Sequence, residues 1–178
     1  FKDGNLNVDS FINNGLLRGA GTINPYSPDG AIVTLENNGT VAPGNSPRNL
    51  IINGDYTQTE WGVLEIELGK SSYDILEVFG RVSLDGILKV SFYDGYVPEA
   101  GTTASFDFLK ASEISGVFDT ITAPDGWLCS LDYLDNDGDG LKDAIQLKMN
   151  PVPVPAALWL LASGLLGLIG MKSRKKTG

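Results

Sequence analysis

Short runs of alternating apolar and polar residues, separated by glycine, restrict the fold of this chain more than any other feature. Residues 63–68 read VLEIEL and residues 88–92 read LKVSF. A period of two places the apolar side chains on one face of a strand and the polar ones on the other. The chain has 22 glycines in 178 residues, together with many Asn and Asp, a composition typical of frequent turns. The sequence therefore predicts an all-β protein, with further strands at 50–52, 75–79 and 82–84.

Loose repeats within residues 1–110 indicate how these strands are arranged. Residues 21–25 read GTINP and recur as GTVAP at 39–43, and the Asn-Asn-Gly turn at 13–15 recurs at 37–39. Short strands joined by Gly and Asn turns favour the coils of a β-solenoid, each of which buries its apolar face against the next. The same pattern is compatible with a β-sandwich, which is the alternative architecture.

One stretch of the repeats resembles a known family. Residues 39–47 (GTVAPGNSP) and 50–58 (LIINGDYTQ) are similar to the C-terminal part of autotransporter-type passenger β-helices. The likeness continues through 64–68, 73–76 and 86–90 and covers about residues 15–110. It implies a right-handed parallel β-solenoid, expected to be the end of a longer region, and the role of an adhesin or a structural stalk.

Residues 111–150 are expected to form a terminal β segment that covers the open edge of the solenoid, as edge strands require. Strands are predicted at 129–134 and 144–149. Large apolar side chains suited to covering that edge occur at Phe106, Phe108, Phe118, Trp127, Leu131 and Tyr133.

An acidic loop lies between the last two predicted strands. Asp135, Asp137 and Asp139 occupy positions 1, 3 and 5 of a calcium-loop pattern, a glycine follows at position 6, and Asp143 falls at position 9. Alternating carboxylates can direct oxygens at one hard cation. Position 12 is Gln146 instead of a bidentate Glu, so the predicted calcium site is a weak one. The alternative is a hairpin whose Asn, Asp and Gly residues serve turn geometry alone.

The C-terminal segment differs in character from the rest of the chain. Ala156 to Met171 contains no charged residue, and as a helix it would span about 24 Å at about 1.5 Å per residue. We expect it to cross a bilayer, with the basic residues that follow held on the cytoplasmic side. A buried core helix and a permanent tail anchor are the alternatives. The basic residues are Lys172, Arg174, Lys175 and Lys176.

This segment, together with the prolines before it, resembles a PEP-CTERM sorting signal, in particular the variant with the motif Val-Pro-Leu-Pro-Ala. The resemblance covers residues 151–178 and implies recognition by an exosortase, a membrane transpeptidase of Gram-negative bacteria that make exopolysaccharide. It also implies transit through the inner membrane and delivery to the cell surface or the extracellular matrix. The residues that match the motif are Val152, Pro153, Val154, Pro155 and Ala156.

Charge and residue types limit the function classes. All 22 acidic residues precede Pro151 with nine basic ones, so residues 1–150 carry a net charge of −13, which disfavours nucleic-acid binding and attracts divalent cations. The chain has no histidine and one cysteine, Cys129, so it lacks any Ser-His or Cys-His arrangement.

Three further groups of side chains are candidate sites. Glu65 and Glu67 would lie about 7 Å apart on one strand face, near the spacing of an inverting glycosidase, but an exposed strand face provides no cleft. Aromatic residues at 56, 61 and 73 would stack sugars if exposed together, although core packing is favoured. Cys129 is expected to be a structural thiol.

These observations predict a non-catalytic structural or adhesion protein of the cell surface or extracellular matrix, with exopolysaccharide as a candidate partner. A polysaccharide-active enzyme on the same scaffold and a calcium-dependent binding module are the alternatives. Calcium is the one cofactor to which the sequence points.

Overall fold

The computed structural model describes residues 2–8, 11–25, 32–44, 48–99 and 101–153, and that part of the chain is all-β. Its strands form one 11-stranded and one 5-stranded sheet. The strands are β1 (Lys2–Val8), β2 (Phe11–Asn13), β3 (Leu16–Pro25), β4 (Thr34–Asn37), β5 (Thr40–Pro43), β6 (Asn49–Ile52), β7 (Asp55–Gln58), β8 (Val63–Leu68), β9 (Ile75–Val78), β10 (Arg81–Leu84), β11 (Ile87–Phe92), β12 (Ala104–Lys110), β13 (Glu113–Gly116), β14 (Thr120–Thr122), β15 (Trp127–Leu134) and β16 (Ala144–Pro151).

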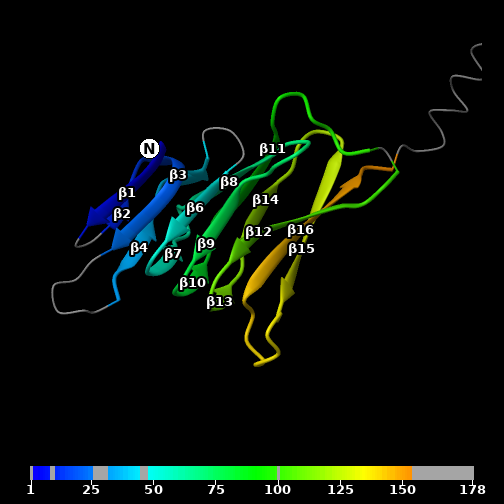
Figure 1. The fold of residues 1–178 in the computed structure, drawn as a ribbon. Coiled ribbons are helices and arrows are strands. Elements are labelled where there is room, and N and C mark those ends of the chain that lie inside the picture. The colour runs from blue at the N-terminus through cyan, green and yellow to red at the C-terminus, as the bar shows by residue number, and fades with distance from the viewer. Residues whose placement is uncertain (1, 9–10, 26–31, 45–47, 100, 154–178) are drawn as a thin grey trace, which may run out of the picture.

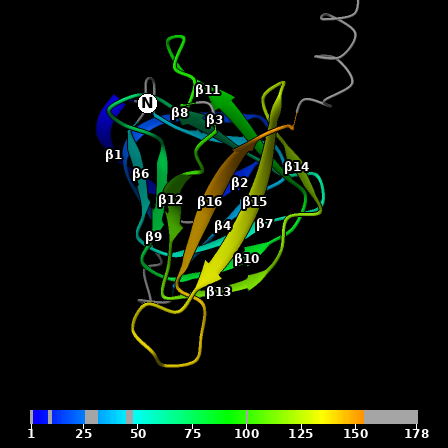
Figure 2. The same ribbon diagram turned by 90° about the vertical axis from the view of Figure 1, so that its right-hand side faces the viewer.

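Every pairing among the strands β1 to β14 is parallel, and these pairings form three ladders. The first ladder runs β1-β3-β6-β9-β12, the second β3-β5-β8-β11-β14 and the third β2-β4-β7-β10-β13. The chain visits the three ladders in turn, so each circuit of the chain stacks on the previous one. Figure 1 shows this stack from β1 and β2 at one end to β15 and β16 at the other, and Figure 2 shows it end-on.

Strand β3 turns the corner between two ladders without a loop. Residues 16–19 pair with β5, whereas residues 21–23 pair with β6. Gly19 and Gly21 have φ angles of 144° and 127°, a region that glycine enters readily and other residues avoid. The bend joins the first and second ladders into the 11-stranded sheet.

The core follows the period-two alternation predicted from the sequence. Leu64, Ile66 and Leu68 of β8 are fully buried, and Leu88 and Val90 of β11 stack beside them. The predicted alternation of these strands is confirmed. The same core includes buried side chains from all three ladders: Ile23, Leu35, Val41, Leu50, Ile52, Tyr56, Leu76, Val78, Val82 and Leu84.

A row of hydrogen-bonded, buried amide side chains, which we call the amide ladder, runs through the interior. It lies at the corner where the chain passes from the third β-ladder to the second. Asn13 Nδ2 donates to Asn37 Oδ1 at 2.8 Å, Asn37 Nδ2 donates to the Tyr56 hydroxyl at 3.2 Å, and that hydroxyl donates to Gln58 Oε1 at 2.9 Å. The three amide side chains also bond to the backbone, as when Asn13 Nδ2 donates to the Thr40 carbonyl at 2.9 Å. These bonds satisfy polar groups that would otherwise be costly to bury.

Of the two repeats seen in the sequence, one stacks at equivalent positions and the other does not. Asn13 lies opposite Asn37, so the two Asn-Asn-Gly turns are equivalent, as predicted. Residues 39–43, however, lie against residues 15–19 and not against 21–25, because Leu16 pairs with Thr40 and Gly19 with Pro43. The similarity between 21–25 and 39–43 is therefore not a stacking repeat, and the structural period here is 24 residues. The GTINP segment bends around the corner, so its likeness to GTVAP does not reflect equivalent positions.

The stack ends in an antiparallel unit. Strand β16 pairs with β12 on one side and with β15 on the other, both antiparallel. Phe106, Phe108 and Phe118 are buried there, and Trp127 and Tyr133 pack against the core from the last strands. Strands β13 and β14 still belong to the parallel ladders, which therefore extend past residue 110 to Thr122.

In the part of the chain that the structure describes, no helix is long and apolar enough to cross a membrane. The predicted span from Ala156 to Met171 lies outside the described residues.

Candidate functional site

The three corners of the stack carry loops of very different length. The connections from β2, β4 and β10 to the next strand have two residues each, and the one from β7 has four. Those after β6, β9 and β12 also have two residues each, whereas most of the connection after β3 lies outside the described residues. The corner from the second to the first ladder, which we call the loop corner, carries residues 69–74, 93–99 and 101–103, together with Gly44 and Arg48. Because β8 and β11 are neighbours in one ladder, the loops that follow them emerge side by side. Long loops on a rigid scaffold are where binding residues concentrate, so the loop corner is the candidate site.

Asp74 holds two of these loops together. Its carboxylate accepts hydrogen bonds from the backbone amide of Arg48 at 3.0 Å and from that of Glu67 at 2.9 Å. Its own amide donates to the Glu67 carbonyl at 3.0 Å. The residue is only 1% exposed, and this burial raises its pKa to about 7, although the two amide bonds oppose the shift. Asp74 thus links neighbouring circuits through hydrogen bonds.

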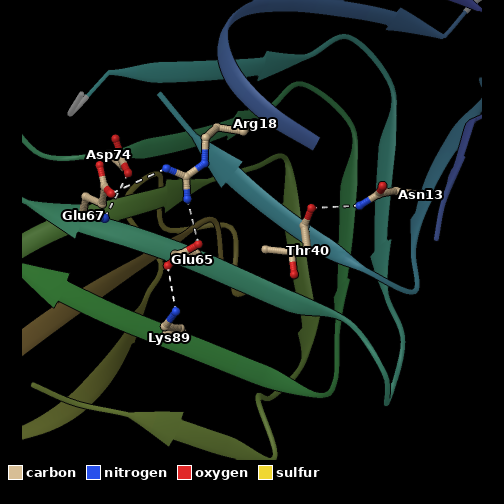
Figure 3. A network of polar contacts seen from close by, with 7 residues as sticks. All are labelled: Asn13, Arg18, Thr40, Glu65, Glu67, Asp74 and Lys89. Atoms are coloured by element: carbon tan, nitrogen blue, oxygen red, sulfur yellow. Dashed lines mark hydrogen bonds and ion pairs between the residues drawn. The ribbon is translucent and has the colours of Figure 1, made fainter. Parts of the chain in front are cut away.

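An ion-pair network lies beside Asp74 on the outer face of the second ladder (Figure 3). Arg18 of β3 reaches across β5 to Glu65 of β8 at 3.0 Å and to Glu67 at 3.8 Å, and Lys89 of β11 contacts Glu65 at 2.9 Å. Ala42, opposite Arg18 in β5, is small enough to let the guanidinium pass. Glu65 and Glu67 are therefore neutralised by neighbouring cations on the strand face where the sequence placed them.

The acidic loop between β15 and β16 brings three of its four predicted ligands together. Oxygens of Asp135, Asp137 and Asp139 all lie within 4.8 Å of one another. Asp143 sits apart from this group and accepts hydrogen bonds from Asn136 at 3.0 and 3.1 Å. Asp135 also accepts hydrogen bonds from the Gly138 and Gly140 amides, which is the turn chemistry of the alternative interpretation. The geometry accommodates both roles.

The aromatic residues considered as a sugar-stacking platform do not meet on the surface. Tyr56 is fully buried in the amide ladder, Tyr73 packs edge-on against Phe106 with ring centroids 5.2 Å apart, and Trp61 is 72% exposed. Core packing, the favoured interpretation, holds for the two tyrosines. The platform itself is not formed, because alternate residues of a strand and its following turn point to different sides.

Cys129 lies half-buried with its Sγ 3.1 Å from the Met149 sulfur. Burial raises the pKa of this thiol to about 11 and keeps it protonated at neutral pH. That environment agrees with the structural role predicted for Cys129.

The sorting motif lies mostly beyond the described chain. Val152 is exposed, and its amide donates to the Gly126 carbonyl at 2.8 Å; Pro153 is exposed as well. The remaining predicted positions, Val154, Pro155, Ala156, Lys172, Arg174, Lys175 and Lys176, lie outside the described residues.

No local sequence pattern marks the residues of the loop corner as a site. Asp74 is a single carboxylate before a strand, and nothing in its local sequence signals burial. Asp94 and Gly95 form a turn dipeptide that was a detectable signal for a hairpin-like loop, but not for its neighbours in space.

Comparison of the chain with protein-family models, curated proteins and solved structures finds no match.

Proposed function

We propose that this chain is a non-catalytic structural or adhesion protein of the cell surface or extracellular matrix of a Gram-negative bacterium. The observation that supports it best is the loop corner, where the loops after β8 and β11 stand together on a stack of parallel strands. A rigid scaffold that presents adjacent loops suits recognition of an extended partner. The carboxylates of Glu65 and Glu67 are occupied by Arg18 and Lys89, which favours a structural role for them over a hydrolytic one.

In this proposal the three parallel ladders are the faces of a right-handed β-solenoid, the successive circuits are its coils, and β15 and β16 are its cap. Crossover connections between parallel strands are right-handed in about 98% of cases. Repeats that contact only their neighbours form long, stiff molecules, which suits a stalk or matrix component.

The proposed route to the surface depends on the C-terminal segment. Ala156 to Met171 holds the chain in the inner membrane with the C-terminus cytoplasmic, and an exosortase recognises the segment that begins at Val152. The exposure of Val152 and Pro153 supports access by such an enzyme. The mature protein then lacks residues after about Ala157.

The test is to fractionate the host cells and sequence the C-terminus of the surface-exposed protein. We expect a surface or matrix form that ends near Ala157, and retention of the uncut form in the inner membrane after Pro153→Ala and Pro155→Ala. An intact C-terminus on surface protein would support a permanent anchor instead. Turnover of the host's own exopolysaccharide by the purified chain would support the enzyme alternative.

A second candidate function, calcium-dependent binding, is favoured by the gathering of the carboxylates of Asp135, Asp137 and Asp139. Oxygen ligands at this spacing suit a hard cation, and a site without the bidentate Glu would bind in the millimolar range. Isothermal titration with millimolar calcium should give heat that Asp137→Ala abolishes. The matched control is Asp132→Ala, because Asp132 lies in β15 and pairs with Lys148, away from the loop tip. Equal heats from the parent chain and the two variants would mean that the loop serves only turn geometry.

A further inference from the structure

Two hollows lie on either side of the loop formed by residues 69–74. The first has a volume of about 530 Å³ and separates this loop from residues 93–97. The second, of about 520 Å³, separates it from the start of β6. Ser72 borders both hollows, so they form two adjoining depressions on the loop corner. Both hollows are widely open to solvent, so they suit a ligand that lies along the surface.

The first hollow combines an aromatic ring with polar groups that are free to bind. Tyr93 is 38% exposed. Lys70 and Asp94 line the same hollow, and among the described residues neither has a hydrogen-bond or ion-pair partner. The tip of this loop is a tight turn in which the Tyr96 amide donates to the Tyr93 carbonyl at 3.0 Å, with φ angles of 51° at Asp94 and 69° at Gly95. Positive φ at both central residues is a type I′ turn, which fixes the positions of Tyr93 and Asp94.

The second hollow extends these features along the loop corner. It is lined by Arg48, Asn49 and Tyr73 together with apolar surface from Ile51 and Ile75. Tyr73 is held by its ring contact with Phe106, and the Arg48 amide is held by Asp74. Both hollows are therefore bordered by backbone that is fixed before any ligand arrives, which lowers the cost of binding.

This chemistry selects among ligand classes. An aromatic ring flanked by a carboxylate, an ammonium and hydroxyls matches the apolar face and the hydroxyl rim of a sugar ring. Repulsion from the net charge of −13 on residues 1–150 disfavours a polyanion. An extended peptide would need an open strand edge, but the bridge between Leu68 and Tyr73 already occupies the backbone at the base of this loop.

We propose that the two hollows form one binding track for a neutral polysaccharide, with one sugar ring on Tyr93 and the chain continuing across Ser72 toward Asn49. Asp94 and Lys70 bond to the hydroxyls of the ring on Tyr93. The inference deepens the proposed function and rests on it for its setting, because a glycan site is what a matrix adhesion protein would use.

The test measures binding of oligosaccharides to the full chain by isothermal titration calorimetry, in a zwitterionic detergent that carries no sugar headgroup. The probes are cellohexaose and xylohexaose as neutral hexamers, glucose as a monomer, and a hexamer of galacturonic acid as an acidic chain. We expect at least one neutral hexamer to bind and glucose not to bind, because only a chain fills both hollows.

Variants then locate the site. Tyr93→Ala should weaken hexamer binding by about tenfold or more, whereas Tyr93→Phe keeps the ring and most of the affinity. Asp94→Asn should weaken binding severalfold while retaining the turn, since Asn-Gly is a favoured type I′ dipeptide. The matched control is Trp61→Ala, which removes an aromatic ring that is 72% exposed but lies outside both hollows.

Three results would overturn the proposal: no heat with either neutral hexamer at millimolar concentration, equal loss of binding in Trp61→Ala and Tyr93→Ala, or stronger binding of the acidic hexamer. None of these depends on sorting. Surface delivery without glycan binding would reject the track alone, and glycan binding by a protein that never reaches the surface would reject the proposed function alone.

Discussion

At the scale of single residues, several buried polar side chains of the described chain make hydrogen bonds between circuits. Asp74 joins two loops through two backbone amides, and Asn37 joins three circuits through its amide. Groups of this kind specify how circuits stack, because a shift of one residue would leave them unpaired in the interior.

Asp74 makes stability depend on pH. Its pKa is raised to about 7 in the folded chain, mainly by burial, while in the unfolded chain it returns to about 3.9. Between those values the folded chain binds a proton that the unfolded chain has lost, so the free energy of unfolding falls as pH rises from about 4 to about 7 and levels off above. Chemical denaturation at a series of pH values measures this slope.

The variant Asp74→Asn is the control for that slope. It is neutral at every pH and still accepts one hydrogen bond through its Oδ1, so the fall between pH 4 and 7 should become shallower than in the parent chain. An unchanged slope in this variant would assign the pH dependence to other groups.

Asn37 is expected to contribute more to the free energy of unfolding than Asn14, an exposed residue of the same type. Asn37→Ala removes the amide that donates to the Tyr56 hydroxyl and to the Val63 carbonyl, and it should lower the free energy of unfolding by about 1–3 kcal/mol. Asn14→Ala removes one exposed bond to Asn38 and should change it by less than about 0.5 kcal/mol. Urea denaturation of both variants provides the comparison, and equal effects would mean that the buried ladder contributes nothing specific.

At the scale of elements, the turns that begin each circuit must stack as closely as the strands. Gly39 lies directly over Gly15, and a Cβ at position 39 would lie 2.7 Å from the Gly15 nitrogen and nearer still to its carbonyl oxygen. Backbone atoms cannot yield as a flexible side chain can. The strands therefore keep their spacing only if position 39 is glycine.

Two substitutions at equivalent turns test this requirement. Gly39→Ala should destabilise the chain by about 1–3 kcal/mol through overpacking. Gly15→Ala should be tolerated, since a Cβ there would meet no heavy atom of the described residues within 4 Å. Thermal unfolding of the two variants provides the measurement. A loss at Gly15 as large as that at Gly39 would show that chain flexibility, and not close stacking, determines the effect.

At the scale of the whole molecule, the antiparallel unit of β15 and β16 protects the end of the stack. Leu147 is fully buried, and it pairs with Phe106 of β12 and Leu131 of β15. Without this cover the β12 edge would present unpaired backbone groups, a template for association with other chains. The acidic loop and the loop after β11 project from opposite edges of the molecule, so the two candidate functions occupy separate surfaces (Figures 1 and 2).

Loss of this cover should appear as aggregation. Leu147→Asp buries an unpaired carboxylate against β12 and should release β16, so light scattering is expected to show large assemblies. Lys148→Gln, one residue along the same strand, removes an exposed ion pair with Asp132 and should leave the chain in its parent assembly state. Aggregation of both variants to the same degree would separate this behaviour from the cover at β12.

The sequence by itself determined those features that depend on a few neighbouring residues. Alternation identified the strand at 63–68 and its buried face, the Asn-Asn-Gly turns were matched correctly, and the loop at 135–140 was located between two strands. Each follows from side-chain periodicity or turn chemistry, which act locally.

Only the tertiary structure decided which segments lie side by side. The likeness of 21–25 to 39–43 does not mark stacked positions, because register depends on packing between circuits and on the bend at Gly19 and Gly21. The loop corner was equally hidden, since Ser72 and Tyr93 meet through the pairing of β8 with β11. Contacts between residues distant in the chain come from the balance of burial and loop closure over the whole molecule, which no local pattern contains.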